Sequence, residues 1–267
     1  APQSDVSGEQ ILIPIQREFV SSDLVDQHHY NQSVLLTLPQ EFSVDVLENI
    51  VLALYQRHDI LRLSFSGGKA QYIPFANELS ERAIQYHDLS ELEGEAWHKE
   101  LAELGNKAKA GLSLDTGDVF RAVLFDGDAD HRRLLLTLHH MVVDGVSWRI
   151  LLQDMATAYE QQQQQDDIQL LPKTSSFQQW GQYLLEYANS SAFRVEKAYW
   201  VTQLEDQVSA LPVDYDAIND NRILDSKTIS FQLNEIKTKA LLNDCASVYR
   251  TQINDLLLSA LYLALIE

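Results

Sequence analysis

The chain has 267 residues, of which 45% are apolar, so it can build the core of one large domain or two modest ones, and global disorder is excluded. Its 20 Lys and Arg residues face 39 Asp and Glu residues, a formal net charge of −19. The resulting field repels polyanions, so we expect neither nucleic acid nor an anionic membrane surface as a partner.

The cysteine content and the two ends indicate where the protein works. Cys245, the single cysteine, cannot form an internal disulfide and suits a reducing cytoplasm, which is the expected location. Residues 1–10 are polar and acidic, without the apolar segment of a signal peptide. The longest apolar run, Leu256–Ile266, is shorter than the roughly 20 residues of a membrane-spanning helix and predicts a buried helix. That run meets the last residue without a cap, so we expect a longer natural polypeptide.

Predicted strands and helices alternate through the first half of the chain. Val34–Leu38 is an apolar run typical of a buried strand, and apolar side chains then recur at helical spacing from Val46 to Leu54, with Ser43 as the N-cap. Two strands flank the turn Gly67-Gly68, which predicts a hairpin. A second helix is predicted over Ala96–Ala110.

The second half begins with two strands, over residues 119–126 and 132–140, on either side of a turn rich in Asp and Gly. A helix follows Gly145 and fades into residues 161–167, a polar low-complexity stretch interpreted as a surface linker. Beyond it we expect helices near 177–188 and 198–204, a strand at 228–233 and two final helices. The alternation favours an α/β layered fold with a mixed sheet and flanking helices.

The run that carries chemistry is HHMVVDGVSW, residues 139–148, between an apolar strand and a helix. Such a junction presents side chains at the end of a rigid sheet. An imidazole exchanges protons near neutral pH, and a nearby acid can fix its tautomer or the neighbouring backbone. Adjacent residues of a strand project to opposite sides, so only one of His139 and His140 can face a cleft.

Simpler interpretations compete with a catalytic one. An isolated His-His pair is more often buried at a strand end, and His28-His29 is interpreted in that way. His140 and Asp144 are four residues apart, but a single cysteine and the lack of a third regularly spaced ligand disfavour zinc, and we expect no metal. Gly67-Gly68 lacks the Gly-Lys-Ser/Thr of a phosphate loop, and the serine elbow of a Ser-His-Asp hydrolase is missing.

The motif His-His-x-x-x-Asp-Gly resembles that of the chloramphenicol-acetyltransferase-like superfamily, which includes condensation and epimerization domains of nonribosomal peptide synthetases. The continuation VVDGVSWRILLQDM is similar to epimerization domains. Further similar segments follow in the same order: Pro14-Ile15-Gln16, Asn31-Gln32-Ser33, His58-Asp59-Ile60-Leu61-Arg62 with Phe65, Leu171–Phe177 with Trp180, and Tyr249–Asp255 with the apolar run after it. The family usually has an aromatic residue where this chain has Glu18, so the entrance to its first helix is expected to differ slightly.

The resemblance implies the chloramphenicol-acetyltransferase-like fold. Residues 1–172 would form the amino-terminal lobe with the motif, and residues 173–267 the linker and an incomplete second lobe. It implies that His140 is catalytic, while His139 packs into its own lobe. Asp144 would pair with Arg62 and so hold the turn. Gly145, Ser147 and Trp148 would face the tunnel of the phosphopantetheine arm.

The implied reaction is inversion, from L to D, of the α-carbon of an aminoacyl or peptidyl thioester. The chain would bind no cofactor itself, because a peptidyl carrier protein supplies the phosphopantetheine arm. The resemblance pairs His140 with a glutamate from the remainder of the second lobe, without dividing the acid and base roles between them. Because this chain lacks that glutamate, it is expected to be inactive alone. The alternatives are a condensation domain that joins carrier-bound thioesters and a non-catalytic fragment that binds a carrier protein.

Overall fold

The computed structural model describes residues 1–22, 24–127, 132–205 and 226–266. It divides into two compact units, residues 1–197 and residues 198–267. The first unit contains both sheets and the motif.

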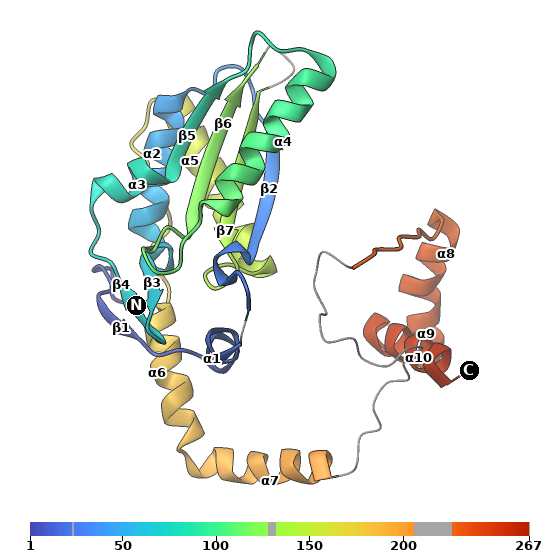
Figure 1. Ribbon diagram of the computed structural model, residues 1–267. Helices are drawn as coiled ribbons and strands as arrows, with labels where there is room; N and C mark the ends of the chain where they lie inside the picture. Colours follow the sequence, from blue (N-terminus) through green and yellow to red (C-terminus); the bar gives the residue numbers. More distant parts are fainter. Residues whose placement is uncertain (23, 128–131, 206–225, 267) are drawn as a thin grey trace. The chain divides into compact units, whose positions relative to one another are not determined.

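The main sheet of the first unit has four strands in the order β2-β7-β6-β5 (Figure 1). Their bounds are β2 Asn31–Thr37, β7 Arg133–His139, β6 Phe120–Asp126 and β5 Ile84–Asp88. β2, β7 and β6 pair antiparallel, whereas β5 runs parallel to β6. The mixed sheet with flanking helices that was expected from the sequence is therefore confirmed.

Helices cover both faces of this sheet, so its inner strands are apolar on both sides. Along β6, Ala122 and Leu124 belong to one core, while Val123 and Phe125 point into the other. The helices α2 (Val44–Arg57) and α5 (Gly145–Gln163) pack on the first core. On the opposite face lies α4 (Gly94–Ala110), which buries Trp97 there (Figure 1).

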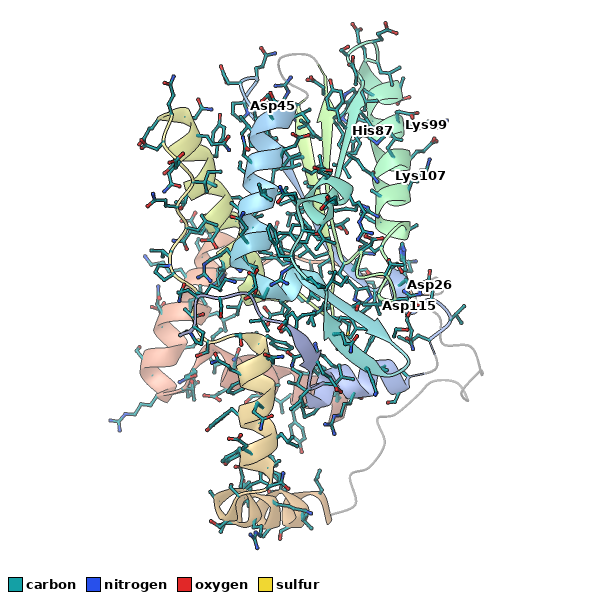
Figure 2. The ribbon with its side chains drawn as sticks, turned by 90° about the vertical axis from the view of Figure 1, so that its left-hand side faces the viewer. Asp26, Asp45, His87, Lys99, Lys107 and Asp115 are labelled. Atoms are coloured by element: carbon teal, nitrogen blue, oxygen red, sulfur yellow. The ribbon has the colours of Figure 1, made fainter. Side chains whose placement is uncertain are left out.

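The helices begin and end where local chemistry predicts. The Ser43 hydroxyl accepts a hydrogen bond from the Val46 amide at 3.2 Å, which confirms it as the N-cap of α2. Figure 2 shows Lys99 and Lys107 on the outer side of α4, away from the sheet. α4 ends at Ala110, as expected from the sequence, and Gly111 is its C-cap.

A small antiparallel sheet, ordered β1-β4-β3, lies beside the main one. Its strands are β1 Gly8–Gln10, β4 Lys69–Tyr72 and β3 Leu63–Ser66. The predicted hairpin is confirmed: Gly67 and Gly68 have φ of 58° and 75°, which the turn joining β3 to β4 requires. β1 has only three residues and carried no periodic signal.

The remaining elements of the first unit are short or peripheral. They are α1 Pro14–Ser21, the 3₁₀ turns Gln27–His29 and Asp59–Arg62, α3 Asn77–Ala83, α6 Phe177–Ala188 and the start of α7 Ser191–Glu205. The Gln178 amide on α6 donates to the carbonyls of Ser7 and Glu9, both at 2.9 Å. α6 thus packs against β1 within the first unit, and the lobe boundary expected at Pro172 stays a prediction.

The segment expected to be a linker is only partly irregular. α5 continues through Gln161 and ends at Gln163. The Gln161 side chain then accepts a hydrogen bond from the Gln169 amide at 2.8 Å, so the chain folds back along the end of the helix.

The described part of the second unit contains the end of α7, the irregular residues 226–234 and further helical segments. These segments are α8 Glu235–Lys239, a π-helical turn Ala240–Asp244, α9 Cys245–Tyr249 and α10 Ile253–Ile266. The strand predicted at 228–233 is wrong, since these residues pair with no strand of the described chain. α10 lies where a buried helix was expected, yet Leu258 and Tyr262 are 65% and 64% exposed. No described helix is both long and apolar enough to cross a membrane.

The loop between α4 and β6 yields a prediction about stability. Gly117 has φ +73°, and an added Cβ would lie 2.4 Å from Ile73 Cδ1. Gly117→Ala should lower the free energy of unfolding by at least about 1–2 kcal/mol, mainly through the left-handed backbone, measured by urea denaturation. Gly111→Ala is the matched control, because its φ is −85° and its nearest atoms are at van der Waals distance. Equal losses in the two variants would contradict this account.

Candidate active site

The motif forms the turn between β7 and α5. β7 ends at His139, and the His140 amide donates to the Tyr30 carbonyl at 2.8 Å, which extends the pairing with β2 by one step. α5 begins at Gly145. At the far end of α2, His58 Nε2 lies 2.7 Å from Asp154 Oδ2 and so ties α5 to that helix. The motif is therefore held by the sheet on one side and by a packed helix on the other.

Asp144 is the N-cap of α5. Its Oδ1 accepts hydrogen bonds from the amides of Val146 and Ser147, at 3.1 and 2.8 Å, and from the Ser147 hydroxyl at 2.6 Å. These hydrogen bonds, those from Ser147 foremost, lower the pKa of the Asp144 carboxyl. Asp144 thus stays ionised and holds the turn through the helix that it starts.

The expected pair between Asp144 and Arg62 is wrong. Arg62 is 1% exposed, forms an ion pair with Asp59 and donates to the Ile73 carbonyl at 2.7 Å. Lys173 Nζ reaches the same Asp59 carboxylate at 3.0 Å. The physical reason is local: Asp59 is three residues before Arg62 in one 3₁₀ turn, so the buried guanidinium has a partner within its own segment.

His139 lies in the interior of the first unit. It is fully buried, its Nε2 donates to the Gln27 carbonyl at 2.7 Å, and its Nδ1 accepts from the Met141 amide at 3.1 Å. The rings of Phe19 and Tyr30 approach it edge-on. Burial lowers the pKa of His139 to about 4, so this ring is neutral at physiological pH.

His140 points to the opposite side. Its Nδ1 lies 2.8 Å from the Val143 carbonyl, and the Tyr30 ring stacks on it with the centroids 5.0 Å apart. A carbonyl oxygen only accepts hydrogen bonds, so in the neutral ring Nδ1 carries the proton and Nε2 has the lone pair. The bond to Val143 closes the turn and fixes the plane of the ring.

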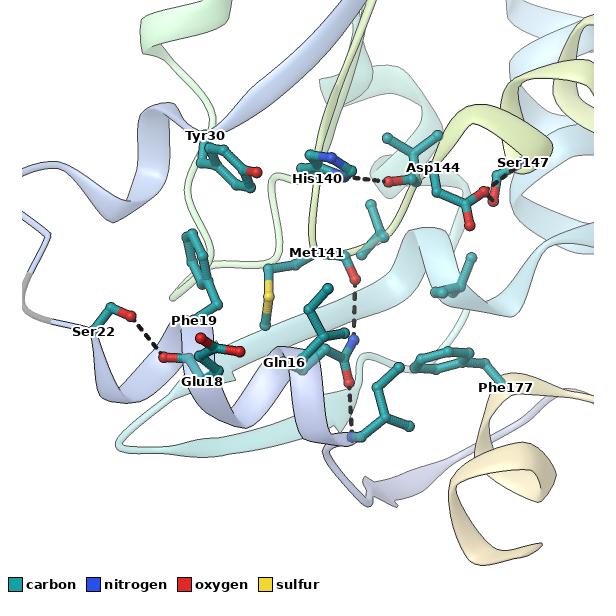
Figure 3. A pocket seen from close by; sticks show the side chains of 15 residues that line it. Gln16, Glu18, Phe19, Ser22, Tyr30, His140, Met141, Asp144, Ser147 and Phe177 are labelled. Atoms are coloured by element: carbon teal, nitrogen blue, oxygen red, sulfur yellow. Dashed lines mark hydrogen bonds between the residues drawn. The ribbon is translucent and has the colours of Figure 1, made fainter. Parts of the chain in front are cut away.

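An apolar pocket of about 530 Å³ opens beside His140 (Figure 3). Its walls come mainly from α1 and the motif, with Phe177 at the start of α6. They include Ile13, Ile15, Gln16, Glu18, Phe19, Ser22, Tyr30, Ile60, His140, Met141, Val142, Val143, Asp144, Ser147 and Phe177. Figure 3 shows the His140 and Tyr30 rings at one end, with Gln16 and Glu18 of α1 across from them. The pocket is thus an apolar site with few polar groups, the usual form of a small-molecule site.

Of Gly145, Ser147 and Trp148, which were expected to face the tunnel of the phosphopantetheine arm, one lines the pocket. Ser147 lines the pocket, whereas Gly145 and Trp148 do not. The Trp148 indole turns instead toward β2, where Nε1 donates to Gln32 Oε1 at 2.9 Å. No role was expected for Tyr30 or Gln32 from the sequence, although Asn31-Gln32-Ser33 was one of the similar segments. Among the described residues, no group of three His, Cys, Asp or Glu side chains could hold a metal ion.

The sequence matches the condensation domain family over residues 6–267. The chain belongs to this family. Over 97% of its residues, the chain is 42% identical to a linear gramicidin synthase subunit of Brevibacillus parabrevis. Over all of its residues, it is 39% identical to surfactin synthase subunit 1 of Bacillus subtilis (strain 168). It covers only 3% and 7% of these two proteins, so it corresponds to one small part of each.

Solved structures agree with the fold of this condensation-family chain. The epimerization domain from the third module of tyrocidine synthetase B matches 99% of the chain with a TM-score of 0.88 and 32% identity, and the chain spans 60% of that domain. The starter condensation domain of rhizomide synthetase matches 76% of the chain with a TM-score of 0.63 and 18% identity. The chloramphenicol-acetyltransferase-like fold expected from the sequence is therefore confirmed.

The two acidic residues of this region should differ in their effect on stability. Asp59→Ala would leave the buried Arg62 with only the exposed Asp5 carboxylate at 3.8 Å and should lower the free energy of unfolding by about 3–5 kcal/mol. Asp144→Ala removes only a helix cap and should lower it by about 1 kcal/mol. Urea denaturation of both variants measures the difference. A larger loss in Asp144→Ala than in Asp59→Ala would contradict the assigned pairs.

The buried His139 predicts a dependence of stability on pH. Its pKa is about 4 when folded and 6.5 in the unfolded chain, so the unfolded state binds more protons between these values. The contribution of His139 to the free energy of unfolding is fully present above pH 6.5. It decreases by up to about 3 kcal/mol as the pH drops toward 4. His139→Gln should flatten the pH dependence of the unfolding free energy. Some slope will remain from His58, whose pKa burial also lowers. If the unfolding free energy of His139→Gln had the same slope against pH as that of the parent, the buried neutral state of His139 would be refuted.

Proposed function

We propose that the chain forms part of a domain that epimerizes the α-carbon of an aminoacyl or peptidyl thioester in nonribosomal peptide synthesis. The observation that supports this proposal most is the His140 ring, which is held by the Val143 carbonyl at the wall of an apolar pocket. In addition, 99% of the chain superposes on a solved epimerization domain. The substrate would reach the pocket on the phosphopantetheine arm of a peptidyl carrier protein.

The proposed epimerization requires a base that is neutral, held in one orientation and shielded from water. A thioester acidifies its α-hydrogen, and removal of that proton gives a planar enolate that can be reprotonated on the opposite face. In His140 the Nδ1 proton is held by Val143, so Nε2 carries the lone pair that would take up a proton. An acid on the other face, a glutamate from the rest of the domain, would complete the exchange.

The lining of the pocket favours a substrate with apolar parts. Ile15, Phe19 and Met141 give it apolar walls, and a low-polarity surrounding strengthens the hydrogen bonds made to a developing enolate oxygen. Glu18 adds one carboxylate on the α1 side, where the family usually has an aromatic residue. The shape of the substrate end of this pocket is therefore expected to differ from that of relatives with the aromatic residue.

Condensation is the second candidate, because the family itself is that of condensation domains. In that reaction an amine attacks an upstream thioester, and His140 would orient or deprotonate the amine. The two functions give different products from the same carrier-bound thioester, a D-aminoacyl thioester in one case and a peptide bond in the other. A fragment that only binds a carrier protein would give neither.

The test is exchange of the α-hydrogen of a carrier-bound L-aminoacyl thioester with deuterium from solvent, catalysed by the complete domain. His140→Ala should slow exchange by about 10²–10⁴-fold, because it removes the proton-transfer group. Its melting temperature should stay close to that of the parent. His98→Ala on the exposed side of α4 is the control and should exchange at the parental rate.

The products decide between the candidates. D-product without a new peptide bond supports epimerization, a dipeptide in the presence of an acceptor supports condensation, and parental exchange in His140→Ala contradicts the role of this residue.

A further inference from the structure

Gln32 stands between Trp148 and His140. Its Oε1 accepts the Trp148 Nε1 proton at 2.9 Å, and its Nε2 lies 3.1 Å from His140 Nε2. Gln32 lies on β2 in register with Leu138 of β7, and Trp148 lies in the first turn of α5. The amide is therefore held between the sheet and the helix that flank the motif.

The hydrogen-bonding groups permit one arrangement. An indole nitrogen is a donor only, so the oxygen of the Gln32 amide must face Trp148. The amide NH₂ group then faces His140 and donates to Nε2, which must carry a lone pair. On the other side of the ring the Val143 carbonyl accepts from Nδ1. Each group is satisfied only when His140 is the neutral Nδ1–H tautomer.

We infer that Gln32, oriented by Trp148, is a positioning residue that keeps His140 Nε2 as a proton acceptor at the start of the reaction. This inference rests on the proposed function, and it divides the roles that the sequence left open. In the L-to-D direction His140 takes the α-proton: the C–H bond breaks, its electron pair forms the enolate, and an N–H bond forms at Nε2. The opposing acid then gives its own proton to the other face.

The same contacts disfavour the protonated ring. In the imidazolium, the new Nε2–H would point at the NH₂ group of Gln32, donor against donor. Rotating the amide by 180° would turn its oxygen toward His140, but it would set the NH₂ group against the Trp148 N–H. Proton uptake therefore requires the Gln32 amide to withdraw. When the amide returns, it favours release of the Nε2 proton to solvent, while the opposing carboxylate takes up a proton from solvent, and both groups are reset for the next turnover.

Three variants test the arrangement in the complete domain. Gln32→Glu keeps an acceptor for Trp148 but places a carboxylate oxygen at His140 Nε2, so it should convert the ring to the imidazolium. Gln32→Met removes both hydrogen bonds at similar size. Trp148→Phe removes the donor that orients the amide. Trp180→Phe, a half-exposed tryptophan of α6, is the matched control.

The primary readout is ¹⁵N NMR of labelled histidine, with the His140 signals assigned by their loss in His140→Asn. The parent should show a protonated Nδ1 and an unprotonated Nε2, and Trp148→Phe a mixture of tautomers. In deuterium exchange, kcat should fall about tenfold in Trp148→Phe and in Gln32→Met with KM unchanged, the size of one net hydrogen bond. The double variant should fall no further, because Trp148 acts through Gln32. The kcat of Gln32→Glu should fall more than that of Trp148→Phe or Gln32→Met, and the kcat of Trp180→Phe should match that of the parent.

The outcomes separate this inference from the proposed function. A parental Nε2–H tautomer, additive losses in the double variant, or parental kcat in both Trp148→Phe and Gln32→Met would overturn the inference even if the domain epimerizes. A domain that catalyses no exchange would overturn the proposed function, whereas the tautomer measured in the same samples decides the role of Gln32.

Discussion

The register between β2 and β7 is the constraint on which the site depends. Asn31 pairs with His139 and Gln32 with Leu138, and the next step beyond the strands is the hydrogen bond from the His140 amide to the Tyr30 carbonyl. Because side chains alternate across a sheet, a slip of one residue would exchange the faces of both histidines and remove Gln32 from the reach of His140. The register is well determined, since Leu134, Leu136 and Leu138 must all enter the same core. The packing of β7 thus determines which side chains lie beside His140 at the end of the strand.

The sheet can hold this register because helices cover it on both sides. The cores on its two faces leave β6 and β7 with little freedom to shift, and α5, packed by Leu151 and Met155, fixes the direction in which the chain leaves the motif. Asp144 connects these two parts, because its carboxylate satisfies the first amides of α5 just where the strand has ended. Asp144 therefore holds the turn through hydrogen bonds to residues two and three positions away, and this turn forms one wall of the pocket.

Local patterns in the sequence predicted most of this frame. The capping serine of α2, the two glycines of the hairpin and the apolar runs of β6 and β7 each signal structure within a few residues, and each lies where it was expected. What the sequence could not supply depends on contacts between distant segments or on very short elements. β1 and β5 are too short for a periodic pattern. The partner of Arg62 was misjudged because a motif does not reveal that Asp59, on the same turn, competes with Asp144. The predicted strand at 228–233 finds no partner strand among the described residues. Gln32 lies in one of the similar segments, but that segment could not reveal its contact with a tryptophan 116 positions later in the chain.

The two neighbouring histidines show how position alone separates identical side chains. His139 donates to a carbonyl and accepts from an amide inside the core, so both ring nitrogens are occupied by the backbone, and burial lowers its pKa to about 4. Both of its nitrogens thus hold backbone groups in place, and His139 does not line the pocket. His140 gives one nitrogen to the Val143 backbone, while the other meets a side-chain amide that can move away. A proton-transfer group needs one nitrogen that is fixed and one that can exchange partners, and only the second histidine has that combination.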